Sequence, residues 1–236
     1  MAVRELSTRA ERVWAWAVLA AGLLTIALAV VLQGIFPAEA ELERGFRSPV
    51  LAFEFARSAD DLAFLAGPGE GPREMRRAMD EGHRWDTIFP FAYGGMLLLL
   101  LLRHGLRGRV EGWVGTATAC VTVIGDLTEN QVLTSITAVL ERGEPADALL
   151  PGLWTATWIK WGALGLTFAA LALCRLRERR PVTAVATALP AVAVGLTYLT
   201  GAPATVAEIM AKAVAGTYVV LIGATVVELY RLHKDP

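Results

Sequence analysis

Three polar side chains recur at helical spacing within an otherwise apolar stretch near the middle of the chain. Asp126, Glu129 and Asn130 follow the i, i+3, i+4 pattern, so a helix places all three on one face. An ionisable residue at membrane depth costs about 2.5–3.5 kcal/mol on the insertion scale, and such residues usually face the protein interior. We therefore expect this face to point into a helix bundle.

Charged residues also interrupt two later apolar stretches. Lys160 lies about 9 Å along a helix from the outer end of its stretch. Glu208 and Lys212 are four residues apart, with the acid first, which is the favourable order for a helical pair. We expect Lys160 and Lys212 to balance Asp126 and Glu129 at similar depth and to face them in the bundle interior.

A further acid and a phenol lie seven residues apart on one face of an earlier stretch, and they extend this group. The candidate ligand-binding residues are Asp86, Tyr93, Asp126, Glu129, Asn130, Lys160, Glu208 and Lys212.

Three functions remain open for such a group. It binds or carries a small polar or amphipathic, lipid-like ligand, or its ion pairs only fix helix packing in a structural or assembly subunit. In the third alternative, the acids act as a general acid and base, or a desolvated lysine acts as a nucleophile, in an enzyme for a lipid-like substrate. We consider an enzyme the less favoured of these, because the sequence has no serine–histidine pair and no glycine-rich phosphate loop.

Composition identifies the class of protein. Of 236 residues, 55% are hydrophobic and 19% are charged, and the mean hydropathy is +0.48. The net charge of −1 gives no electrostatic case for nucleic acid. The two cysteines are far apart and the three histidines lie outside the apolar stretches, so we expect neither a metal nor a cofactor. The expected partner is the lipid bilayer, and the sequence does not indicate an oligomeric state.

Apolar stretches near 20 residues are long enough to cross a bilayer as helices. The sequence therefore predicts an all-α, polytopic integral membrane bundle forming a single domain over residues 1–236. It has about six spans, at residues 13–36, 85–102, 113–140, 153–174, 182–200 and 204–230.

The segment 37–84 between the first two spans is predicted to be a helical extracytoplasmic cap. It contains an apolar helix over 48–55, a second helix capped by Ser58, and a third over 72–81. The third places Met75 and Met79 on one face among arginines, a pattern typical of a helix lying in the membrane interface. The cap is either a lid over the outer face or a solvated connector resting on lipid headgroups.

Basic residues predict the orientation. Arg4, Arg9 and Arg12 precede the first span, and further basic groups follow the second, fourth and sixth spans. Short loops rich in Lys and Arg stay cytoplasmic, so both termini are predicted to be cytoplasmic.

Two short motifs resemble a known pattern. An Asp-x-x-Phe-x-x-x-Tyr segment begins at Asp86, and an Asp-x-x-Glu-Asn segment begins at Asp126 in the following span. This pair resembles a pattern in uncharacterised bacterial multi-pass membrane proteins. The resemblance covers under a third of the chain and implies a bacterial cytoplasmic (inner) membrane, but it brings no activity.

Overall fold

The computed structural model describes residues 8–234, and over that range it contains helices joined by turns and loops but no strand. Arg4, which entered the charge count, lies outside the described residues. The eight α-helices of this range are α1 (Thr8–Ile35), α2 (Pro49–Glu54), α3 (Glu70–Asp86), α4 (Phe89–Leu106), α5 (Val110–Glu141), α6 (Leu150–Arg177), α7 (Pro181–Leu199) and α8 (Ala204–Lys234). Three short 3-10 helices join them: η1 (Glu43–Gly45), η2 (Asp60–Leu65) and η3 (Asp147–Leu149).

Five helical segments of the described residues are long and apolar enough to cross a membrane. They are Arg9–Ile35, Glu70–Leu106, Asp147–Arg177, Pro181–Leu199 and Ala204–Lys234. The helix α5 is not one of the five, because Asp126, Glu129 and Asn130 interrupt its apolar sequence. The all-α class is therefore confirmed, with five candidate membrane-spanning segments among the described residues, and the sequence prediction of about six spans is not confirmed.

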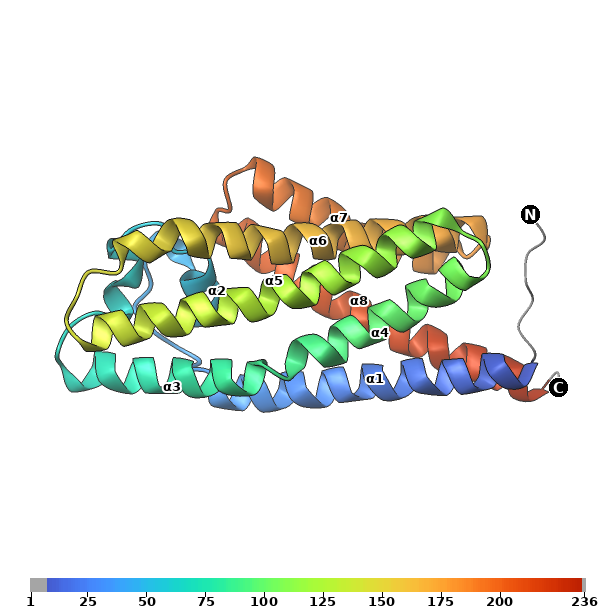
Figure 1. Ribbon diagram of the computed structural model, residues 1–236, viewed down its shortest axis with the longest axis horizontal. Helices are drawn as coiled ribbons and strands as arrows, with labels where there is room; N and C mark the ends of the chain where they lie inside the picture. Colours follow the sequence, from blue (N-terminus) through green and yellow to red (C-terminus); the bar gives the residue numbers. More distant parts are fainter. Residues whose placement is uncertain (1–7, 235–236) are drawn as a thin grey trace.

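The helices form an elongated bundle (Figure 1). Along the bundle α5 packs between α4 and α6, while α1 contacts α4 and α8, and α7 lies against α6 and α8. The start of α1, the end of α8, and the α4–α5 and α6–α7 connections all lie at one end (Figure 1). The 32 residues of α5 extend about 48 Å, which exceeds the roughly 30 Å of a hydrocarbon core.

The segment 37–84 is helical as expected and packs tightly at the opposite end of the bundle. The side chain of Ser48 caps α2 by accepting a hydrogen bond from the N–H of Leu51, and η2 follows Ser58. A hydrophobic cluster joins this segment to the bundle. It includes Phe53, Leu62, Leu65, Met79, Leu133, Ile136 and Leu153. The segment is therefore a packed part of the fold and not a solvated connector.

The helix α3 differs from the sequence prediction in both length and position. It runs through the whole of Glu70–Asp86 and leads directly into α4 (Figure 1). It packs along α5 and α1 instead of lying apart in an interface. The physical reason is its buried face: Met79 is fully buried, and Arg76 donates hydrogen bonds to the carbonyl of Leu65 and to the carboxylate of Glu141.

Candidate functional site

The site begins at a close approach of α5 and α6. A Cβ atom added to Gly125 would lie 2.8 Å from the backbone nitrogen of Lys160 and 3.0 Å from its Cα. Only glycine permits this approach without displacing a backbone. It brings the side chain of Lys160 against the polar face of α5.

Lys160 contacts three carboxylates in the bundle interior. Its Nζ donates a hydrogen bond to the carboxylate of Glu129 and lies 3.7 Å from Oδ1 of Asp126. The third acid is Glu54, whose Oε1 is 3.0 Å from the same Nζ. The side chains of Lys160 and Asp126 are each 7% exposed and that of Glu129 is 1% exposed. The interior positions predicted for these three residues are thus confirmed.

Glu54 was not among the sequence candidates. It ends the short helix α2 and is held by two groups of α6: Nε1 of Trp161 donates to its Oε2 at 3.1 Å, and Oγ1 of Thr157 donates to its backbone carbonyl at 3.0 Å. The available signal was a single acid inside the apolar run from Val50 to Phe55. The sequence gives no indication, however, that this run inserts against α6.

Hydrogen bonds connect α4 and α3 to the same group. The hydroxyl of Tyr93 donates to Oδ2 of Asp126 at 2.6 Å. The amide of Asn130 donates to Oδ2 of Asp86 at 2.7 Å. The structure therefore gathers most of the sequence candidates around the polar face of α5: Lys160 contacts Asp126 and Glu129, Tyr93 donates to Asp126, and Asn130 and Asp86 form a separate hydrogen-bonded pair.

Two candidates, Glu208 and Lys212, take no part in these contacts. Lys212 is exposed on α8, so the prediction that it faces the interior is wrong. The buried face of α8 includes Met210 and Val214, and a residue midway between them points to the opposite side. Glu208 does not pair with Lys212. Its Oε1 accepts hydrogen bonds from the backbone N–H groups of Arg47 at 2.5 Å and Ser48 at 3.3 Å, just before α2.

The balance of charge also differs from the prediction. We define the acid–lysine cluster as Glu54, Asp86, Asp126, Glu129 and Lys160. Three of these carboxylates contact the single ammonium group and the fourth, Asp86, accepts a hydrogen bond from Asn130, whereas the sequence suggested equal numbers of acids and lysines. Buried carboxylates are costly unless each is paired, protonated or matched by a bound group. One buried oxygen, Oε1 of Glu129, has no hydrogen-bond partner among residues 8–234.

A pocket of about 850 Å3 between α3, α4 and α5 lies next to this cluster, although none of the five cluster residues lines it. Asn130 lines the pocket and also donates to Asp86, so it connects the two. His83 lines it as well and is only 2% exposed, although its position outside the apolar stretches gave no signal for burial. We call this cavity the α3–α5 pocket. Its other lining residues are Arg77, Asp80, Glu81, Arg84, Thr87, Phe91, Leu127, Gln131 and Thr134.

The chemistry of the site is that of charged hydrogen-bonding groups. Within residues 8–234, no three His, Cys, Asp or Glu side chains are arranged to hold a metal ion. The carboxylates can accept hydrogen bonds, share protons or pair with a cationic group, and the ammonium can only donate. No protein-family model, curated protein or solved structure matches this chain.

Proposed function

We propose that the chain is a six-span protein of a bacterial cytoplasmic membrane, with both termini on the cytoplasmic side. The sixth span is α5, whose length of about 48 Å is sufficient for a crossing. Its acidic residues face α6 and α4 rather than lipid, which removes the main objection to their depth. The first turns of α1, the last turns of α8 and the connections after α4 and α6 carry basic residues and lie at one end of the bundle, in agreement with this orientation (Figure 1).

We further propose that the acid–lysine cluster binds or carries a small polar or amphipathic, lipid-like ligand. The observation that carries this proposal is the surplus of buried carboxylates next to the α3–α5 pocket, which is lined by Asn130, the donor to Asp86. Ion pairing that served packing alone would require one acid for Lys160, and the structure supplies Glu54, Asp126 and Glu129. A ligand with hydrogen-bond donors or a positive charge would match the remaining acids.

The α3–α5 pocket suits an amphipathic ligand because its lining is both charged and apolar. Its wall combines charged residues of α3, including Arg77, Asp80 and Arg84, with the apolar side chains of Phe91 of α4 and Leu127 of α5. A polar headgroup would lie among the charges, and an apolar chain would lie along Phe91 and Leu127.

Native mass spectrometry of the detergent-purified protein tests this function. We expect the wild type to retain a discrete bound mass and Glu129→Gln to lose it. The Gln variant should stay folded, because Lys160 keeps its contacts with Glu54 and Asp126. The exposed Glu74→Gln on α3 is the matched control and should retain the mass.

A structural role is the second candidate, and one observation favours it. Lys160 joins α6 to α5 through Glu129 and to α2 through Glu54, so it ties three elements together. In that case Glu129→Gln lowers the melting temperature, and the purified wild type carries no bound mass. That pair of results would contradict the ligand-binding proposal.

A further inference from the structure

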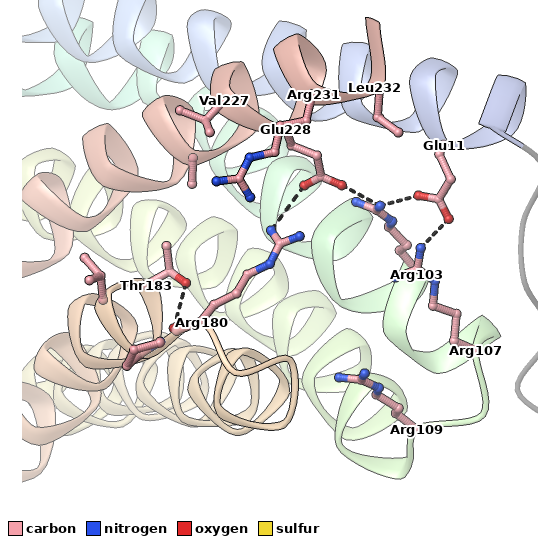
Figure 2. A pocket seen from close by; sticks show the side chains of 13 residues that line it. Glu11, Arg103, Arg107, Arg109, Arg180, Thr183, Val227, Glu228, Arg231 and Leu232 are labelled. Carbon is pink, nitrogen blue, oxygen red and sulfur yellow. Dashed lines mark hydrogen bonds and ion pairs between the residues drawn. The ribbon is translucent and has the colours of Figure 1, made fainter. Parts of the chain in front are cut away.

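A second pocket lies at the end of the bundle where α1 begins and α8 ends, far from the acid–lysine cluster. It has a volume of about 720 Å3 and is formed by α1, α4, α7, α8 and the connections beside α5 and α7. Five arginines and two glutamates line it. The arginines are Arg103, Arg107, Arg109, Arg180 and Arg231, and the glutamates are Glu11 and Glu228 (Figure 2). We call it the arginine pocket.

The glutamates are already engaged by arginines of the wall. Arg103 contacts Glu11 and lies 2.5 Å from Oε1 of Glu228, and Arg180 lies 3.6 Å from the other oxygen of Glu228 (Figure 2). Arg107 also pairs with Glu11. The two glutamates therefore do not neutralise all five arginines of the pocket.

An exposed arginine carries part of this excess positive charge. Arg231 is exposed and forms no ion pair within residues 8–234. Behind the wall, Glu178 is surrounded by positive groups. Burial would raise the pKa of Glu178, but His104, Arg175 and Arg180 outweigh burial and lower it. Positive potential thus dominates this end of the bundle.

The start of α7 adds a second feature that favours anions. Pro181, Val182 and Thr183 form its first turn and line the pocket, and no side chain caps this helix end. The N–H groups of residues 182 and 183 have no acceptor within the helix, because the first turn of any helix lacks one. A helix N-terminus with free N–H groups beside arginines is a favourable place for a phosphate.

We propose that the arginine pocket binds a phosphate group, and that this phosphate is the headgroup of an anionic phospholipid. Val182 and Val227 are 77% and 49% exposed at its wall, so acyl chains would find apolar surface next to the charged groups. A basic pocket between helices at the cytoplasmic side is the arrangement that recognises anionic headgroups. This site is separate from the α3–α5 pocket and does not depend on the function proposed for it.

Two variants test the proposal without removing an internal contact. Arg231→Gln neutralises an exposed arginine that has no ion pair among residues 8–234. Val182→Glu places an acid in the first turn of α7, where it favours the helix but repels an anion. Arg177→Gln is the matched control, because it removes one charge from the same end but does not line the pocket.

Binding is measured by native mass spectrometry with phosphatidylglycerol or phosphatidylcholine of the same acyl chains, and separately by calorimetry with inorganic phosphate. We expect phosphatidylglycerol to bind about tenfold more weakly to Arg231→Gln, as the loss of one charge-assisted hydrogen bond implies, and not at all to Val182→Glu. Phosphatidylglycerol should bind to Arg177→Gln as it binds to the wild type. Phosphatidylcholine binding should be the same in all variants.

The lipid and inorganic phosphate experiments together distinguish a lipid headgroup from a soluble phosphate compound. If inorganic phosphate binds with the same sensitivity to both variants and phosphatidylglycerol does not bind, the pocket is a phosphate site for a soluble compound and the lipid assignment is wrong. Equal weakening by Arg177→Gln, or no change in either test variant, would overturn the phosphate site itself. Thermal melts of all variants confirm that they are folded.

Discussion

Replacing Lys160 by methionine should destabilise the protein strongly. Methionine retains most of the length and volume of the lysine, so the change removes the ammonium with little effect on packing. It leaves Glu54, Asp126 and Glu129 without their shared cation in the bundle interior. The result would be a set of buried acids with no positive partner among the groups that now contact Lys160.

The magnitude follows from the geometry. At 3.0 Å, the separation of Lys160 and Glu54, an ion pair is worth about 5–6 kcal/mol at an effective dielectric constant near 20. Desolvation of the two charges costs several kcal/mol per ion and offsets most of this attraction. Removing one partner recovers only its own desolvation cost, so we expect Lys160→Met to lower the free energy of unfolding by about 3–5 kcal/mol.

The assay is reversible unfolding in mixed micelles with sodium dodecyl sulfate, followed by the intrinsic fluorescence of the seven tryptophans. The control is Lys212→Met, which removes an exposed lysine from α8 and should change the free energy of unfolding by less than about 0.5 kcal/mol. A Lys160→Met variant as stable as Lys212→Met would refute the reasoning, because it would show that the cluster does not depend on its only ammonium.

Three further predictions concern other parts of the molecule. Gly125→Ala should lower the free energy of unfolding by about 1–3 kcal/mol, because its Cβ would meet the backbone of α6 at 2.8 Å. Gly162→Ala is the control and should cost little, because Gly162 has open space around it. Chemical unfolding of both variants gives the comparison. Glu208→Ala removes the acceptor of two backbone N–H groups before α2, so amide hydrogen exchange in residues 47–56 should speed up, and unchanged exchange would contradict this role. The pKa of Glu178 is lowered in the folded protein, because neighbouring positive groups outweigh burial. The ionised Glu178 therefore stabilises the fold above its unfolded pKa of about 4.3, and this stabilisation is lost as the pH falls through the folded pKa. The melting temperature of Glu178→Gln should therefore depend less on pH below about 5 than that of the wild type; parallel curves would argue against it.

Helical spacing was sufficient to predict the polar face of α5. Asp126, Glu129 and Asn130 share a face because 3.6 residues form a turn, and the cost of burying charge in lipid directs that face inward. The interior position of Lys160 followed from the same cost. These inferences succeed because they depend on one helix at a time and on the solvent around it.

Contacts between elements could not be predicted in this way. Lys212 is charged and lies in an apolar stretch, but the rotation of α8 about its axis is set by packing, and that rotation exposes it. Glu54 and His83 enter the site only because α2 and α3 dock on the bundle. Local periodicity carries no information about that docking, so the number of acids around Lys160 was underestimated.

The most direct test of ligand binding is to fill the α3–α5 pocket without touching the acid–lysine cluster. Thr134 lines the pocket, and its hydroxyl donates only to the carbonyls of Asn130 and Gln131 in its own helix, so Thr134→Trp occupies space but breaks no hydrogen bond between helices. Thr128→Trp is the matched control, because Thr128 is exposed on the same helix outside the pocket. Our account predicts, by native mass spectrometry, a bound mass in the wild type and in Thr128→Trp that Thr134→Trp lacks at an unchanged melting temperature. Retention of that mass by Thr134→Trp, or a wild type without any bound mass, would contradict it.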